Sequence, residues 1–159
     1  MDEKANHLKA AIAAGVGVLT GLWGWLGWLV VLWVALMALD YITGSAAACR
    51  KGDWASWRAR EGIWHKAGMV TVVIVAAGAD LLISLVLANL PVLALPVRYP
   101  GLVGPVVLVW YIVTELGSVT ENAVMMGAPV PAWLTRLLAA GKAAMDKAGD
   151  ALTVEEEER

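Results

Sequence analysis

The stretch TVVIVAAGADLLISLVLANL, from Thr71 to Leu90, decides the fold class because it is a continuous apolar run of membrane-crossing length. A helix needs about 20 mostly apolar residues to cross the hydrocarbon core. One acid, Asp80, stands near the middle of this run, and the run contains no lysine or arginine. The stretch therefore predicts a membrane helix that carries an unexplained acid about halfway along its length.

The composition of the whole chain supports a membrane protein. Of the 159 residues, 60% are hydrophobic and only 16% are charged, and the mean hydropathy is +0.68. This balance excludes an ordinary water-soluble domain. The net charge of −2 gives no case for nucleic-acid binding. Cys49 is the single cysteine, which excludes an intrachain disulfide, and His7 and His65 lack partners at ligand spacing, so we expect no metal and no cofactor.

Glycine and proline divide the apolar sequence into three spans. No charge occurs between Lys9 and Asp40, and the segment GLWGWLGW within this region predicts a break between two helices. We expect an N-terminal apolar helix over residues 6–20 and the core of span one over 25–39. Span two covers about 68–90, and span three runs from 101 or 105 to about 126, after a proline-rich connection that cannot be helical.

The predicted fold is an all-α membrane protein with three transmembrane helices and three accessory helices. The accessory helices are the short N-terminal apolar helix, a cytoplasmic interfacial helix and a C-terminal amphipathic helix. The expected organisation is an N-terminal helix (1–24), a three-span membrane domain (25–126) and a cytoplasmic amphipathic helix with an acidic tail (127–159).

Basic residues predict the orientation. Five lysines and arginines lie between spans one and two, one lies between spans two and three, and four follow span three. By the positive-inside rule, the first connection and the C-terminus are cytoplasmic and the N-terminus is outside. We therefore expect a multi-pass membrane protein with this orientation.

Tryptophans cluster where membrane interfaces are expected. The chain has nine tryptophans and no phenylalanine, and tryptophan favours the interface because it joins an apolar ring to one N–H donor. One group borders the GLWGWLGW break, and the other gives the first connection the pattern of a helix lying on the inner leaflet. The expected anchors are Trp23, Trp25, Trp28, Trp54, Trp57 and Trp64.

Two spans each carry one polar stripe. In span two, Ala76, Asp80, Ser84 and Ala88 recur every fourth residue and share a helix face. In span three, a second stripe recurs at steps of four, three and four and places an acid near mid-span, again without a basic residue in that span. Its members are Tyr111, Glu115, Ser118 and Asn122.

Three interpretations of these stripes stay open from the residues alone. The acids can be protonated and join helices by hydrogen bonds, or they can line a water-filled lumen in an oligomer, or they can serve proton-coupled transport. All three predict that the acids avoid lipid. The sequence shows no catalytic constellation and no phosphate-binding loop, so we do not expect an enzyme.

Three groups of residues together resemble the phage holin and toxin-secretion holin family. The family carries a D-Y-x-T-G motif at the end of span one, a connection with spaced lysine and glycine, and an E-x-x-S-x-x-E-N segment followed by G-x-P-x-P. The matching residues are Asp40, Tyr41, Thr43, Gly44, Lys51, Gly52, Ser56, Gly62, Lys66, Glu115, Ser118, Glu121, Asn122, Gly127, Pro129 and Pro131.

This resemblance covers about residues 25–138 and implies a function. Such proteins form homo-oligomers among membrane lipids and permeabilise the inner membrane, so that an endolysin or a toxin crosses it without binding stably to the holin. A small oligomeric ion channel or proton-linked transporter subunit is the alternative, and a membrane scaffold is a third hypothesis.

Overall fold

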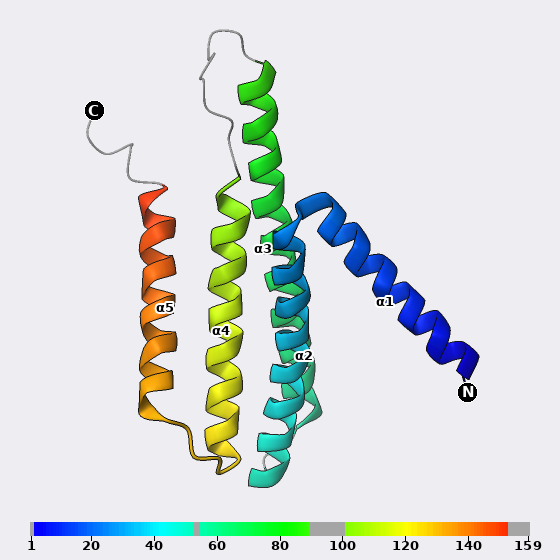
Figure 1. Cartoon of the computed structure of the whole chain (residues 1–159). Helices are drawn as coiled ribbons and strands as arrows, with labels where there is room; N and C mark the ends of the chain where they lie inside the picture. Colours follow the sequence, from blue (N-terminus) through cyan, green and yellow to red (C-terminus); the bar gives the residue numbers. More distant parts are fainter. Residues whose placement is uncertain (1, 53–54, 90–100, 153–159) are drawn as a thin grey trace.

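The computed structural model describes residues 2–52, 55–89 and 101–152. Within these ranges the chain is helical and has no strand, which confirms the all-α prediction. In Figure 1 the first helix slants away from the others, which stand side by side. The helices are α1 (Asp2–Trp23), α2 (Trp25–Lys51), α3 (Ser56–Asn89), α4 (Val103–Met125) and α5 (Ala132–Ala151).

The predicted break between the first two helices lies at Gly24. Its φ of 57° falls in the left-handed region, which glycine adopts without the cost that a side chain would add. The chain reverses direction there. In Figure 1, α1 rises from the N-terminus toward this turn, and α2 runs back down into the bundle. The glycine in GLWGWLGW therefore separates the N-terminal helix from span one.

Three helices are long and apolar enough to cross a membrane, in agreement with the three predicted spans. They are α2, residues 59–89 of α3, and α4, with mean hydropathies of 1.9, 2.5 and 1.5. The expected inner-leaflet helix and span two form one continuous helix, because α3 begins at Ser56 and contains no proline. Trp57 and Trp64 are exposed on its first turns.

The helix α4 lies at the centre of the bundle. None of its residues from 103 to 120 is exposed, because α2 and α3 cover one side and α5 covers another. The core joins α2, α3 and α4, and the Trp33 ring stacks on the Tyr111 ring at a centroid distance of 5.8 Å. The buried core residues are Trp33, Leu36, Met37, Met69, Leu108 and Ile112.

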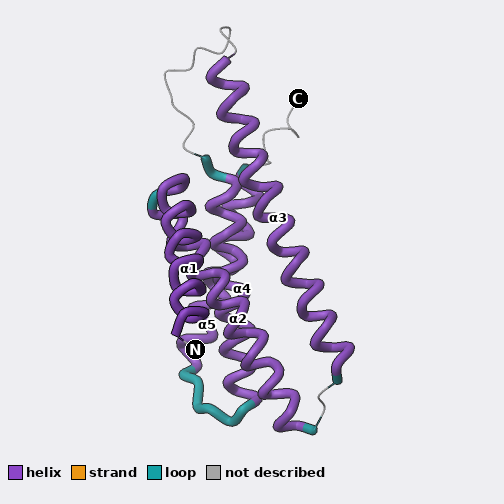
Figure 2. The backbone as a smooth tube through the Cα atoms, turned by 90° about the vertical axis from the view of Figure 1, so that its right-hand side faces the viewer, coloured by secondary structure: helices purple, strands orange, loops and turns teal. Residues whose placement is uncertain are grey.

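The lower ends of α2 and α3 separate, whereas α4 and α5 stay together. Figure 2 shows α3 diverging from α2 toward its first residues. Near Pro131 the chain turns back, so α5 runs antiparallel beside α4 (Figure 1). These two features leave one open groove among α2, α3 and α4 and another between α4 and α5.

Candidate functional site

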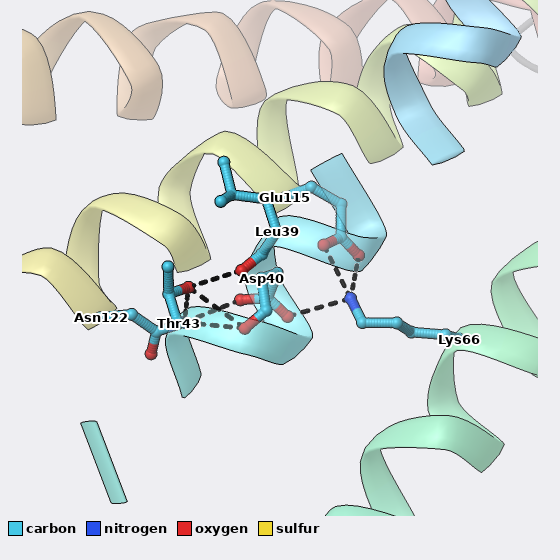
Figure 3. Close-up of polar contacts among 6 residues, drawn as sticks. All are labelled: Leu39, Asp40, Thr43, Lys66, Glu115 and Asn122. Atoms are coloured by element: carbon cyan, nitrogen blue, oxygen red, sulfur yellow. Dashed lines mark hydrogen bonds and ion pairs between the residues drawn. The ribbon is translucent and has the colours of Figure 1, made fainter. Parts of the chain in front are cut away.

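The most strongly polar contact between the membrane helices is an ion cluster of three side chains from three helices. Lys66 of α3 donates to both carboxylate oxygens of Glu115 on α4, at 2.7 and 2.8 Å. The same Nζ lies 2.9 Å from Oδ2 of Asp40 on α2. Figure 3 shows the lysine reaching between the two carboxylates. One cation thus holds α2, α3 and α4 together.

This cluster corrects the expectation that Glu115 has no basic partner. Glu115 is buried, with 3% of its surface exposed, and Lys66 reaches it because α3 begins about three turns earlier than the predicted span. The sequence placed Lys66 in the connection rather than in the span. Its position is nevertheless readable from helical periodicity, because Lys66, Met69, Val73 and Ala77 recur at steps of three and four and share one helix face.

A second set of bonds extends the cluster toward the end of α2. Asn122 of α4 donates to Asp40 Oδ1 at 2.9 Å and to Thr43 Oγ1 at 3.1 Å, and the Thr43 hydroxyl donates to the Leu39 carbonyl at 2.9 Å. Gly44 leaves the space for this amide, because a Cβ there would lie 3.4 Å from Asn122 Nδ2. The D-Y-x-T-G motif therefore fixes the crossing of α2 and α4 (Figure 3).

The cluster is charged and largely buried, so each of its charges needs a partner of opposite charge. Two carboxylates and one ammonium give a formal charge of −1, and the side chains are 4 to 21% exposed. The attraction within a buried ion pair roughly balances its desolvation, but removal of one partner leaves an unpaired buried charge at a cost of about 3–5 kcal/mol. The contacts therefore specify the helix arrangement more than they add net stability.

Asp80 accepts three backbone hydrogen bonds from the first residues of α4. The Leu102 and Val103 N–H groups donate to Oδ1 at 3.1 and 3.0 Å, and the Gly104 N–H donates to Oδ2 at 2.7 Å. These N–H groups lack partners within their own helix, and the helix N-terminus carries partial positive charge that favours a carboxylate. Asp80 thus acts as an N-terminal cap supplied by a neighbouring helix.

The position of Asp80 also corrects its predicted depth. It is level with the start of α4 rather than halfway through the bundle, because α3 continues beyond the point where α4 begins (Figure 1). Ser84 is accordingly exposed, one turn past this contact, whereas Ala76 is buried against the bundle. Only the lower half of the predicted stripe in span two therefore faces protein.

Glycines adapt this end of α4 to the carboxylate. Gly101 has a φ of 74°, and a Cβ on Gly104 would lie 3.0 Å from Asp80 Oδ2. A cavity of about 150 Å³ beside Asp80 is lined mainly by apolar residues of α2, α3 and α4. This pairing was not predicted from the sequence.

The groove at the diverging ends of α2 and α3 has a volume of about 360 Å³. Its walls include Asp40 and Lys66 of the ion cluster together with Tyr41, Ser118 and Glu121. Tyr41 and Glu121 are exposed, whereas Ser118 is partly buried. The structure thus brings together most of the residues of the D-Y-x-T-G and E-x-x-S-x-x-E-N motifs. Across the described residues, no group of three acidic, histidine or cysteine side chains could hold a metal ion.

A second groove, of about 640 Å³, lies between α4 and α5. Near one end of it, the Trp110 indole N–H donates to Asp146, and the Lys142 ammonium lies 5.1 Å from the centroid of the Trp110 ring. This contact was not predicted, because the C-terminal helix was expected on the cytoplasmic side, away from the spans. An amphipathic pattern indicates that a helix has two faces but does not identify its partner.

The structure describes the side chains of four of the six predicted interface anchors. Trp25, Trp28, Trp57 and Trp64 expose 56 to 77% of their surfaces, as an outward-facing ring requires. Trp54 and the side chain of Trp23 lie outside the described residues. Pro129 and Pro131 form the turn into α5, which begins directly after Pro131 with its extended backbone (φ −62°, ψ 131°).

Comparison with known proteins identifies the family. The model of the bacteriophage holin family matches residues 17–142, which includes all three spans and both groups of polar contacts. This chain is a member of the bacteriophage holin family. The holin is also 31% identical, over 138 residues, to an uncharacterised protein of Halalkalibacterium halodurans, and the match covers 87% of the holin and 93% of the relative. No solved structure matches it. With three candidate spans, the holin is a multi-pass membrane protein.

Proposed function

We propose that this holin oligomerises in the bacterial inner membrane and permeabilises it, releasing an endolysin that lyses the host or, in some bacteria, a toxin. The observation that carries this proposal is the combination of holin-family membership with three apolar spans whose acids Glu115 and Asp80 are hydrogen-bonded within the subunit. Such a subunit can accumulate in the bilayer without harm until assembly changes the membrane. Its activity requires oligomerisation and no catalytic residue, cofactor or bound nucleic acid.

The proposed orientation follows from the charges at the two ends of the bundle. Arg50, Lys51, Arg60 and Lys66 gather where α2 ends and α3 begins, and basic residues near the ends of spans favour the cytoplasmic side. This end of the bundle, with the 360 Å³ groove, is therefore cytoplasmic, and the chain enters α2 from the outer side.

Controlled expression in a bacterium that also contains a cytoplasmic endolysin tests the function. We expect growth to continue normally, to stop abruptly, and then to give way to lysis as the enzyme reaches the cell wall. Cells with the endolysin alone form the control and should keep growing. Loss of membrane potential without enzyme release would contradict the proposal and favour the small ion channel, and normal growth at high expression would also contradict it.

A further inference from the structure

The position of α5 is not explained by a cytoplasmic location alone. Contacts between α4 and α5 run from Met125 and Thr135, which line one end of their groove, to Trp110 and Asp146 at the other end. The 15 residues from Trp110 to Met125 rise about 22 Å along α4, because each helical residue adds about 1.5 Å. Since α4 is a membrane span, α5 lies at membrane depth over most of the hydrocarbon core.

Helix α5 carries charged side chains that are unsuited to lipid, together with the exposed apolar side chains of Trp133 and Leu137. It is not among the candidate spans, and each of its five ionisable side chains is exposed. A charged side chain deep in the bilayer carries a large free-energy cost unless it faces water or a partner. The five residues are Arg136, Lys142, Asp146, Lys147 and Asp150.

The groove beside this surface has a mixed polar and apolar lining and is wide enough for several water molecules. Its volume is about 640 Å³, and one water occupies about 30 Å³ in the liquid. Half of its lining residues are polar, and Glu121 and Lys142 contribute opposite charges. The polar lining residues are Thr114, Ser118, Thr120, Glu121, Thr135 and Lys142.

From this arrangement we propose that α4 and α5 together form the water-facing wall of the permeabilised membrane. The α4–α5 groove and the charged face of α5 border the aqueous path, which carries water, inorganic ions and the solutes that leave the cell. Lipid covers the opposite side of the subunit, where Ile74 and Leu82 of α3 expose 66% and 62% of their surfaces. This inference rests on the proposed function and assigns its water-facing surface.

This assignment differs from the water-filled lumen, lined by Asp80 and Glu115, that the polar stripes of spans two and three suggested. Glu115 and Asn122 are buried by contacts within the subunit, and Asp80 is bonded to the first turn of α4. The α4–α5 wall needs none of these bonds to break, because the charged side chains of α5 are already exposed beside the half-buried hydroxyls of α4. The three membrane helices can therefore remain packed while the membrane is open.

A disulfide between α4 and α5 tests their contact in the membrane. A Cβ on Gly141 would lie 3.6 Å from Val113 Cγ1, which is close enough for Val113→Cys and Gly141→Cys to be joined. Both changes are made in the full chain with Cys49→Ala, because Cys49 is exposed and would react. In membranes from lysing cells we expect most of this variant to form an intramolecular disulfide, and a control pairing Val113→Cys with Ala143→Cys should form little. Absence of the first crosslink would overturn the inference.

Thiol labelling tests the exposure of the wall to water. After lysis begins, a charged, membrane-impermeant thiol reagent should modify Thr114→Cys and Thr135→Cys at least ten times faster than Ile74→Cys, all in the Cys49→Ala background. Two groove positions on different helices guard against a variant that fails to fold. Two results would overturn this inference but leave the proposed function intact. One is an equal labelling rate at all three positions, and the other is a lack of labelling at the groove positions in cells that release the enzyme. If the unaltered protein releases no enzyme, the proposed function fails and the inference fails with it.

Discussion

Replacement of Lys66 by methionine should destabilise the bundle by about 3–5 kcal/mol. Methionine keeps most of the side-chain length and removes the charge, so Glu115 and Asp40 lose their shared cation. Removing one partner of a buried pair costs about 3–5 kcal/mol. Glu115 is 4% exposed, so the expected loss falls in this range.

The assay is reversible unfolding of the purified protein in mixed detergent micelles, followed by tryptophan fluorescence and helical circular dichroism. Lys51→Met is the matched control, because Lys51 is exposed at the end of α2, and its effect should stay within about 0.5 kcal/mol. The double variant Lys66→Met/Glu115→Leu should recover about 2 kcal/mol, since it removes the buried unpaired charge as well. A loss from Lys66→Met no larger than the control, or a double variant less stable than the single one, would refute the reasoning.

Three further predictions use the same unfolding assay. Asp80→Ala should cost about 1–3 kcal/mol because three N–H groups of α4 lose their acceptor, and Asp80→Asn should recover part of this loss. Gly104→Ala should cost about 1–2 kcal/mol because its Cβ would press on the Asp80 carboxylate at 3.0 Å. Trp33→Phe should cost less than about 1.5 kcal/mol, whereas Trp33→Ala should cost about 3–5 kcal/mol, because the buried indole N–H has no hydrogen-bond partner among the described residues and the ring provides the packing.

A control variant or a contradicting outcome tests each of these three predictions. Gly78→Ala is the control for Gly104→Ala, because a Cβ at Gly78 meets open space and alanine favours helix. Equal losses at the two glycines would contradict the close approach at Asp80. If Asp80→Ala behaves like the unaltered protein, the cap contributes nothing, and if Trp33→Phe is as damaging as Trp33→Ala, the indole N–H has an essential partner.

Periodicity and composition predict the helices of this holin better than they predict its contacts. The three spans and the break at Gly24 follow from uninterrupted apolar runs and from glycine, which are local properties of the chain. The partner of Glu115 was missed because the predicted start of span two excluded Lys66, although the two side chains meet across 49 residues of sequence. Apolar content marks where a helix can enter lipid, but a helix often begins before that point.

The depth of Asp80 shows a second limit of sequence reasoning. Counting residues along one span assumes that neighbouring helices begin and end at the same level, whereas α4 starts level with Asp80 and leaves the end of α3 projecting (Figure 1). The docking of α5 shows a third limit, because its apolar stripe fits either a membrane surface or another helix. Contacts in the folded structure, such as those of Trp110 with Asp146 and Lys142, identify α4 as its partner.

Release from vesicles tests the central claim, permeabilisation, most directly. Purified holin is reconstituted at increasing density into lipid vesicles that contain both a small dye and an enzyme of lysozyme size. Above a threshold density, both the dye and the enzyme should escape together. Retention of the enzyme at every density, with selective conduction of ions alone, would contradict the account and identify the protein as a small channel.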